Sequence, residues 1–94
     1  MVTLTEAQRD ELSMRILPLA MDSIFIHNPD AARFSRDELT EVVFEATKHF
    51  ADYIENISKS DYVEITDEII SAGTSNAVAI LVLFIESQVG TDDN

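Results

Sequence analysis

The hydrophobic pattern is clearest between Ser35 and Ile57, where apolar residues recur at intervals of three and four positions. This spacing places them along one face of an α-helix. The apolar stripe comprises Leu39, Val43, Ala46, Phe50, Tyr53, Ile54 and Ile57, and the facing charged stripe comprises Glu38, Glu41, Glu45, Lys48, Asp52 and Glu55. Ser35 and Glu38 have the spacing of a capping box, in which each side chain bonds to the other residue's backbone N–H. The pattern therefore predicts an amphipathic helix that begins directly after Ser35.

A second helical pattern precedes this one. Thr5 and Gln8 form another capping-box pair, and the apolar positions that follow at helical spacing are Leu12, Ile16, Leu19 and Ala20. Pro18 falls inside the run, where it lacks an N–H and its ring clashes with the preceding turn. We expect either a kink at Pro18, or one helix that ends near Leu17 and another that begins at Pro18. The sequence His27-Asn28-Pro29-Asp30 is a strong breaker and ends the run.

The chain after Lys59 is also predicted to be helical. Ser60 can cap a third helix that carries Asp61 and Glu64 in its first turns. Gly73 has the position of a glycine that ends such a helix. The sequence therefore favours a third helix over roughly the twelve residues that precede Gly73.

A fourth helix follows in this interpretation, over residues 76–88, and Gly90 closes it. Two alternatives remain open, because periodicity cannot decide the structure of a run that is apolar on every side. One is a single helix over residues 61–89 with a weak point at Gly73. The other is a buried strand over residues 78–85, where Val and Ile are frequent.

Together these segments predict an all-α fold, a small compact bundle of three to five helices in a single domain of residues 1–90. The 94-residue chain contains no internal repeat and no linker that would divide it. Residues 91–94 are expected to form a flexible acidic tail. So small a bundle has little interior for its apolar residues, so the apolar C-terminal helix is expected at its centre or at the interface of a homodimer.

The stretch Ile69–Ile85 contains no charged residue, which raises the question of a membrane span. A helical span needs about 20 apolar residues, and its cytoplasmic flank usually carries Lys or Arg. Polar residues interrupt the stretch between Gly73 and Asn76, and no basic residue follows Lys59. We therefore expect a buried helix and no membrane partner. The absence of cysteine and of a signal-peptide pattern favours a cytoplasmic protein.

The charge of the chain narrows the choice of partner. Eighteen Asp and Glu residues outnumber six Lys and Arg residues, which gives a formal net charge of −12. No basic residue follows Lys59, whereas seven acidic residues do. Solubility asks for a net charge of only about 2–8 in a small domain, and a larger negative charge repels nucleic acid and anionic membranes. We therefore expect a basic protein surface as partner and no direct binding of nucleic acid.

Two carboxylate pairs provide an enzymatic alternative. Glu38-x-x-Glu41 and Glu64-x-x-Asp67 each place two carboxylates on one helix face. Two such pairs on antiparallel helices can hold Mg²⁺ against the phosphates of a substrate. The layout resembles the paired E-x-x-E and E-x-x-D motifs of the MazG-like, all-α nucleotide pyrophosphohydrolases, over Asp37–Asp67 at most. The resemblance implies Mg²⁺ as a cofactor, with these four carboxylates as its ligands.

Other features weigh against catalysis. A nucleoside triphosphate also requires cationic side chains, and no Lys or Arg follows the second motif. Glu45, His49 and Asp52 have a spacing that can support acid–base chemistry, but a surface ion pair between His49 and Glu45 is the preferred explanation. The chain has neither a nucleophile elbow nor a glycine-rich phosphate loop. We therefore expect no catalytic residue and no cofactor, with the Mg²⁺-dependent enzyme as the alternative.

The acidic helical surface remains as the candidate functional element. Carboxylates at helical spacing recur about every 5 Å, so a rigid helical pair can imitate a ridge of phosphates. The predicted function is a non-catalytic inhibitor or adaptor of the phage or mobile-element type, which occupies a basic site on a nucleic-acid-handling protein. A structural assembly subunit is a further alternative. The predicted partner-binding residues are Glu38, Glu41, Glu45, Asp52, Glu55, Asp61, Glu64, Asp67 and Glu68.

Overall fold

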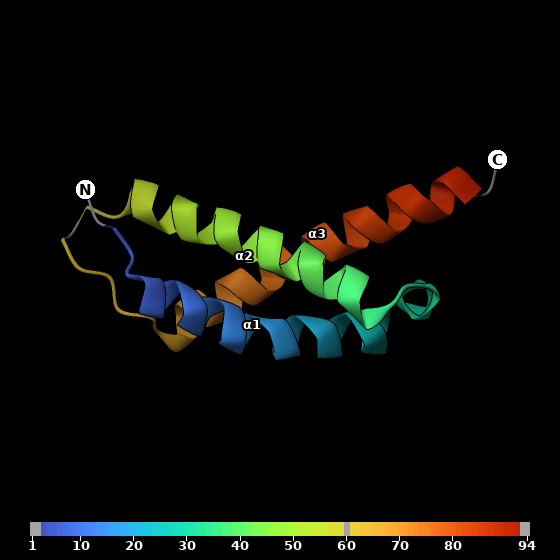
Figure 1. The fold of residues 1–94 in the computed structure, drawn as a ribbon, viewed down its shortest axis with the longest axis horizontal. Coiled ribbons are helices and arrows are strands. Elements are labelled where there is room, and N and C mark those ends of the chain that lie inside the picture. The colour runs from blue at the N-terminus through green and yellow to red at the C-terminus, as the bar shows by residue number, and fades with distance from the viewer. Residues whose placement is uncertain (1–2, 60, 93–94) are drawn as a thin grey trace.

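The computed structural model describes residues 3–59 and 61–92, and this part of the chain is built from helices without a strand (Figure 1). The elements in chain order are α1 (Glu6–His27), the short 3₁₀-helix η1 (Pro29–Arg33), α2 (Arg36–Ile57) and α3 (Asp67–Asp92). The predicted all-α fold is therefore confirmed, with three long helices in the described residues. The alternative of a buried strand over residues 78–85 is wrong, because that segment lies inside α3.

Helix α1 begins where its capping box predicts and continues through Pro18 without a break. Both hydrogen bonds of the box between Thr5 and Gln8 are formed, each at 3.0 Å. Pro18 is tolerated because it lies on the exposed face, where water can reach the carbonyl group of Met14 that its ring leaves without an N–H donor. The alternative of two helices that meet at Pro18 is therefore wrong. The helix ends at His27, as the breaker predicts.

Helix α2 also begins at its predicted capping box, with Ser35 as the N-cap. Most of the predicted apolar stripe is buried or half-buried, but Tyr53 and Ile57 are 57% and 55% exposed. Thr47 and Ala51 are buried in addition. The buried arc is rotated in this way because α2 packs against α1 on one side and α3 on the other.

A single helix, α3, occupies the region in which two were favoured. Gly73 does not end a helix, and it lies where α3 packs closely against the other two long helices. A Cβ atom at Gly73 would lie 2.5 Å from Cδ1 of Ile16 and 2.9 Å from Cε2 of Phe50. The helix also continues past Gly90, which the sequence placed at its end. The absence of a Cβ at Gly73 therefore serves the contact between the helices and not a turn.

Helix α3 begins at Asp67. The single-helix alternative had placed this start at Asp61. The hydroxyl of Thr66 accepts a hydrogen bond from the N–H of Ile69 at 3.2 Å, which is the role of a helix N-cap. The connection before it is non-helical and is held to α1 by a bond of 2.7 Å from Gln8 Nε2 to the Val63 carbonyl. The predicted cap Ser60 lies outside the described residues, as do Asp93 and Asn94 of the predicted tail.

The helices pack so that α1 and α2 run side by side in opposite directions, and α3 crosses both (Figure 1). One face of α3 enters the core through Ile70, Ala77, Leu81 and Ile85, which are at most 4% exposed. The other face of α3 stays open to solvent, and Leu83 is 66% exposed. The apolar helix therefore lines the core along one side and is not enclosed by the bundle.

Helix α3 between Asp67 and Gly90 is long and apolar enough to cross a membrane, by length and composition alone. It is the single helix of this kind in the described part of the chain. Core helices of soluble bundles share these properties, so the observation leaves the location of the protein open.

Candidate functional site: an acidic-rimmed groove between α2 and α3

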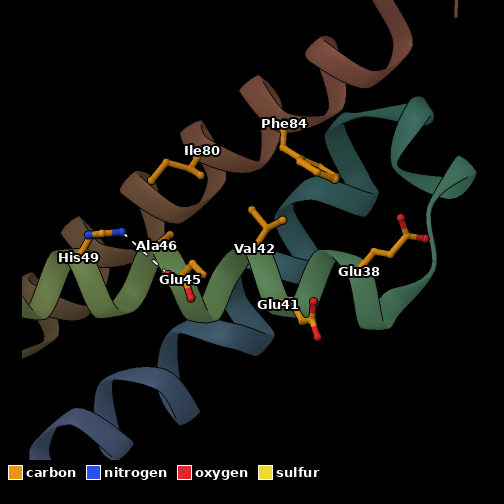
Figure 2. Close-up of a pocket in the computed structure, with 8 residues that line it drawn as sticks. All are labelled: Glu38, Glu41, Val42, Glu45, Ala46, His49, Ile80 and Phe84. Carbon is orange, nitrogen blue, oxygen red and sulfur yellow. Dashed lines mark ion pairs between the residues drawn. The ribbon is translucent and has the colours of Figure 1, made fainter. Parts of the chain in front are cut away.

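A groove of about 390 Å³ lies between α2 and the C-terminal half of α3 (Figure 2). Its apolar floor is formed by Val42 and Ala46 from α2 and by Ile80 and Phe84 from α3. The two residues of each pair are four positions apart, so they lie on the same face of their helix. The ring of Phe84 packs against that of Phe34, with centroids 5.5 Å apart, which fixes this end of the floor.

The rim of the groove is acidic on the α2 side. Glu38, Glu41 and Glu45 line it and are all exposed. Glu38 is fixed by the capping box, in which its Oε1 accepts bonds from the backbone N–H and the hydroxyl of Ser35 at 3.3 and 3.1 Å. His49 stands one turn beyond Glu45, and its Nε2 lies 3.9 Å from Glu45 Oε2 (Figure 2). The predicted pair between Glu45 and His49 is thus present as a surface contact.

A second hollow, of about 330 Å³, continues the groove along the same two helices. His49 and Ile80 line both hollows, so the two adjoin there. Phe50 and Tyr53 from α2 and Asn76 from α3 complete the second one. We call the two hollows together the α2–α3 seam. The seam is apolar along its floor, and its acidic part is the end nearest the start of α2.

Asp52 and Glu55 of the predicted acidic surface are engaged within the protein. Arg9 on α1 donates to Asp52 Oδ1 at 2.7 Å and to Glu55 Oε1 at 2.9 Å. The other oxygen of Glu55 accepts the backbone N–H of Leu4 at 2.6 Å. The hydrogen bond from Arg9 holds the pKa of the Asp52 carboxyl below its usual value, and the same bond raises the pKa of Arg9. These carboxylates tie α2 to α1.

The remaining predicted acidic residues lie beyond the opposite end of α2. Asp61 and Glu64 lie in the connection between the helices, and Asp67 and Glu68 lie in the first turn of α3. Arg15 donates to Asp67 Oδ1 at 2.9 Å, and this bond is the main cause of the raised pKa of Arg15. The nine predicted residues are therefore spread over three regions, and the structure brings only Glu38, Glu41 and Glu45 to one groove.

The two carboxylate pairs of the enzymatic alternative are not brought together. Glu38 and Glu41 lie in the first two turns of α2, whereas Glu64 and Asp67 follow its last residue. The part of α2 that separates them, from Glu41 to Ile57, is about 24 Å long at 1.5 Å per residue. Within residues 3–59 and 61–92, no group of three or more His, Asp or Glu side chains could hold a metal ion. The geometry of the described residues thus offers no shared Mg²⁺ site for these four carboxylates.

The apolar floor of the groove was not foreseen from the sequence. Val42 falls outside the cleanest stripe of α2, and Ile80 and Phe84 belong to a run that is apolar on all sides. One signal in the sequence could have located the α2 part of the floor. Val42 and Ala46 are four residues apart on one helix face, directly beside Glu41 and Glu45, which have the same spacing. Phe44, also outside the stripe, lines a different hollow together with Asp10, Ser13 and Met14.

No protein-family model matches the chain, and no curated protein or solved structure matches it significantly.

Proposed function

We propose that this protein is a non-catalytic interaction protein that binds a basic surface of a nucleic-acid-handling protein through the acidic end of the α2–α3 seam. The observation that carries the proposal is the alignment of Glu38, Glu41 and Glu45 along a groove with an apolar floor. Apolar area supplies affinity, and the carboxylates select a cationic partner and exclude anionic ones. An inhibitor or adaptor in the cytoplasm, with no direct contact to nucleic acid or membrane, fits this surface.

The charge of the whole protein supports the same partner class. A net charge of −12 creates a field that speeds the approach of a basic protein and slows that of an acidic one. None of the residues that line the two hollows of the seam is Lys or Arg. The partner's cations therefore meet no competing positive charge in the seam itself.

The test is capture of binding proteins from the source cells by the immobilised protein, at about 0.1 M and about 1 M salt, where the Debye length falls from about 10 to about 3 Å. We expect the captured protein to be lost at high salt and to be displaced by excess duplex DNA, because both would occupy its basic site. Glu41→Lys should abolish capture, whereas Glu68→Lys, the same charge change at an exposed site at the start of α3, should leave it intact. Capture that is indifferent to salt would refute the proposal.

A structural assembly subunit is the second candidate, and exposed apolar side chains favour it. Leu19 and Ile26 on α1 and Leu83 on α3 are 49%, 75% and 66% exposed. Exposed apolar side chains mark contacts with other chains where they form a contiguous patch. A homodimer through them would appear as a doubled mass in light scattering, and Ile26→Asp or Leu83→Asp would restore the monomer.

The Mg²⁺-dependent pyrophosphohydrolase is not favoured by the positions of its proposed ligands. It predicts release of pyrophosphate from nucleoside triphosphates that depends on Mg²⁺ and is lost in both Glu41→Gln and Glu64→Gln. Glu41 lies near the start of α2, and Glu64 lies after its last residue. Activity that needs both residues would therefore require the two ends of α2 to meet at one metal ion, which the described positions do not allow.

A further inference from the structure

Resting on the function proposed above, we infer that the α2–α3 seam binds one basic amphipathic helix of the partner, which packs there as a fourth helix of the bundle. Helices that dock into grooves do so through apolar side chains at positions i, i+3, i+4 and i+7. The length, the floor and the charge of the seam each match such a helix.

The seam is elongated in the way that a helix requires. Its two hollows adjoin at His49 and Ile80 and extend along α2 from Glu38 to Tyr53. Fifteen residues of α-helix rise about 22 Å, so the seam accommodates about four turns of a docked helix. A compact metabolite would need one enclosed pocket, whereas both hollows are open and follow one line.

The apolar surface continues from the floor onto one lip of the seam. Leu83 follows Ile80 by three residues, which places it about 60° around α3 from Ile80, on the flank away from the core residue Leu81. It is 66% exposed. Ala46 on the floor is small and leaves room for a large side chain of the docked helix. An apolar stripe on the partner would therefore cover the floor and Leu83 together.

The opposite lip fixes the charge of the partner helix. Glu38, Glu41 and Glu45 are separated by three and four residues, so their carboxylates follow one flank of α2 over about 10 Å. Lys or Arg at positions i, i+3 or i+4, and i+7 on the partner would face them. Because the carboxylates lie on the α2 lip alone, the basic residues of the partner belong on one side of its apolar stripe. Simple imitation of phosphates would require no apolar floor.

The probe for this inference is a synthetic helical peptide of about 18 residues, enough for about five turns, with a leucine stripe and lysines along one flank. A control peptide has the same residues in an order that gives no apolar face. Isothermal titration calorimetry of the full chain should show binding of the first peptide, at least about tenfold weaker binding of the second, and a weaker affinity at high salt.

Matched variants locate the contact. Leu83→Asp should weaken peptide binding at least about tenfold, whereas Ile26→Asp, the same change at a more exposed position on α1, should leave it unchanged. Glu41→Lys should weaken binding and Glu68→Lys should not. In the unaltered protein, the NMR signals of Ala46 and Ile80 should shift on titration and those of Leu19 should not, a readout that needs no variant to fold.

Each contrary outcome has a distinct meaning. Equal binding of both peptides, or equal effects of Leu83→Asp and Ile26→Asp, would overturn the docked helix while salt-sensitive capture of a basic protein still supported the proposed function. Loss of capture by the protein together with intact peptide binding would overturn the proposed function alone. A dimer that Leu83→Asp converts to a monomer would show that a second copy of this chain covers the seam, and would also overturn the inference.

Discussion

The Cα atom of Gly73 lies so close to Ile16 that a Cβ atom would come within 2.5 Å of its Cδ1. Ile16 is completely buried, and Phe50 presses on the same point from α2. Gly73 therefore marks the place where all three long helices meet. Every larger residue would have to push the helices or their side chains apart.

Replacing Gly73 by Ala should therefore destabilise the protein by up to about 2 kcal/mol, because overpacking costs about 1–3 kcal/mol and the gain in helix propensity offsets about 1 kcal/mol of it. The measurement is urea unfolding followed by circular dichroism. Gly90→Ala is the control, because no atom lies within 4 Å of its added Cβ. This variant should be as stable as the original or slightly more so. A Gly73→Ala protein of unchanged stability would contradict the packing described here.

Shortening Ile16 should compensate for an alanine at position 73. Ile16→Val removes the Cδ1 atom that the new Cβ would meet, although alone it should cost about 0.5–1.5 kcal/mol of stability. The double variant should lose less than the sum of the two single losses, by about 0.5 kcal/mol or more. Unfolding free energies of all four proteins, compared as a double-mutant cycle, check this. Strict additivity would mean that Phe50 and not Ile16 limits the space.

The ion pair between Arg9 and Asp52 should give the protein a specific sensitivity to acid. Arg9 lowers the pKa of folded Asp52 below the ordinary 3.8, so the unfolded chain takes up its proton first as the pH falls. The stabilisation is therefore complete above about pH 5 and is lost progressively below about pH 4. Arg9→Gln should be less stable than the original at pH 7, and the difference should narrow toward pH 3. Urea unfolding across this range measures it.

The control for that experiment is Asp52→Asn, which keeps Arg9 and its contact with Glu55. Asp52→Asn should show the same pH-dependent loss of unfolding free energy as Arg9→Gln. A difference between the original and Arg9→Gln that stays the same from pH 7 to pH 3 would show that Arg9 acts by packing alone.

The capping box at the start of α2 should contribute measurably to stability. The hydroxyl of Ser35 accepts the N–H of Glu38 at 3.1 Å, and Ser35→Ala would leave that donor to water. The expected cost is about 1 kcal/mol, or about 4–8 °C in Tm for a domain of this size. Ser71→Ala, at an exposed position in the second turn of α3, is the matched control and should change Tm little. Equal effects of the two substitutions would argue against the cap.

The acidic lip of the seam should be under electrostatic strain in the absence of a partner. Glu41 has Glu38 three residues before it and Glu45 four residues after it, and like charges at these spacings repel on a helix. Glu41→Gln should therefore stabilise the free protein by about 0.2–1 kcal/mol, and less in high salt. Glu86→Gln, which has no charged residue three or four positions away, should have a smaller effect. Thermal unfolding at two salt concentrations distinguishes them.

Local interactions determined much of this fold from the sequence alone. The capping boxes at Thr5 and Ser35 and the breaker at Asn28-Pro29 set the ends of α1 and the start of α2. These signals can be recognised in the sequence because each involves residues within four positions of one another and does not depend on tertiary contacts. The amphipathic pattern of α2 is readable for the same reason. The large negative charge is likewise a property of composition, and the proposed class of partner was inferred from it.

Tertiary contacts decided the rest. Gly73 has the local appearance of a helix end, but the packing of Ile16 and Phe50 against its backbone keeps it inside α3. The sequence could not show which acidic residues are paired within the protein, because that depends on which helices Arg9 and Arg15 contact. The apolar floor between Val42 and Phe84 exists only because α3 crosses α2 at that position. Spacing along one helix fixes which face a residue occupies, whereas the neighbour of that face is fixed only when the helices pack.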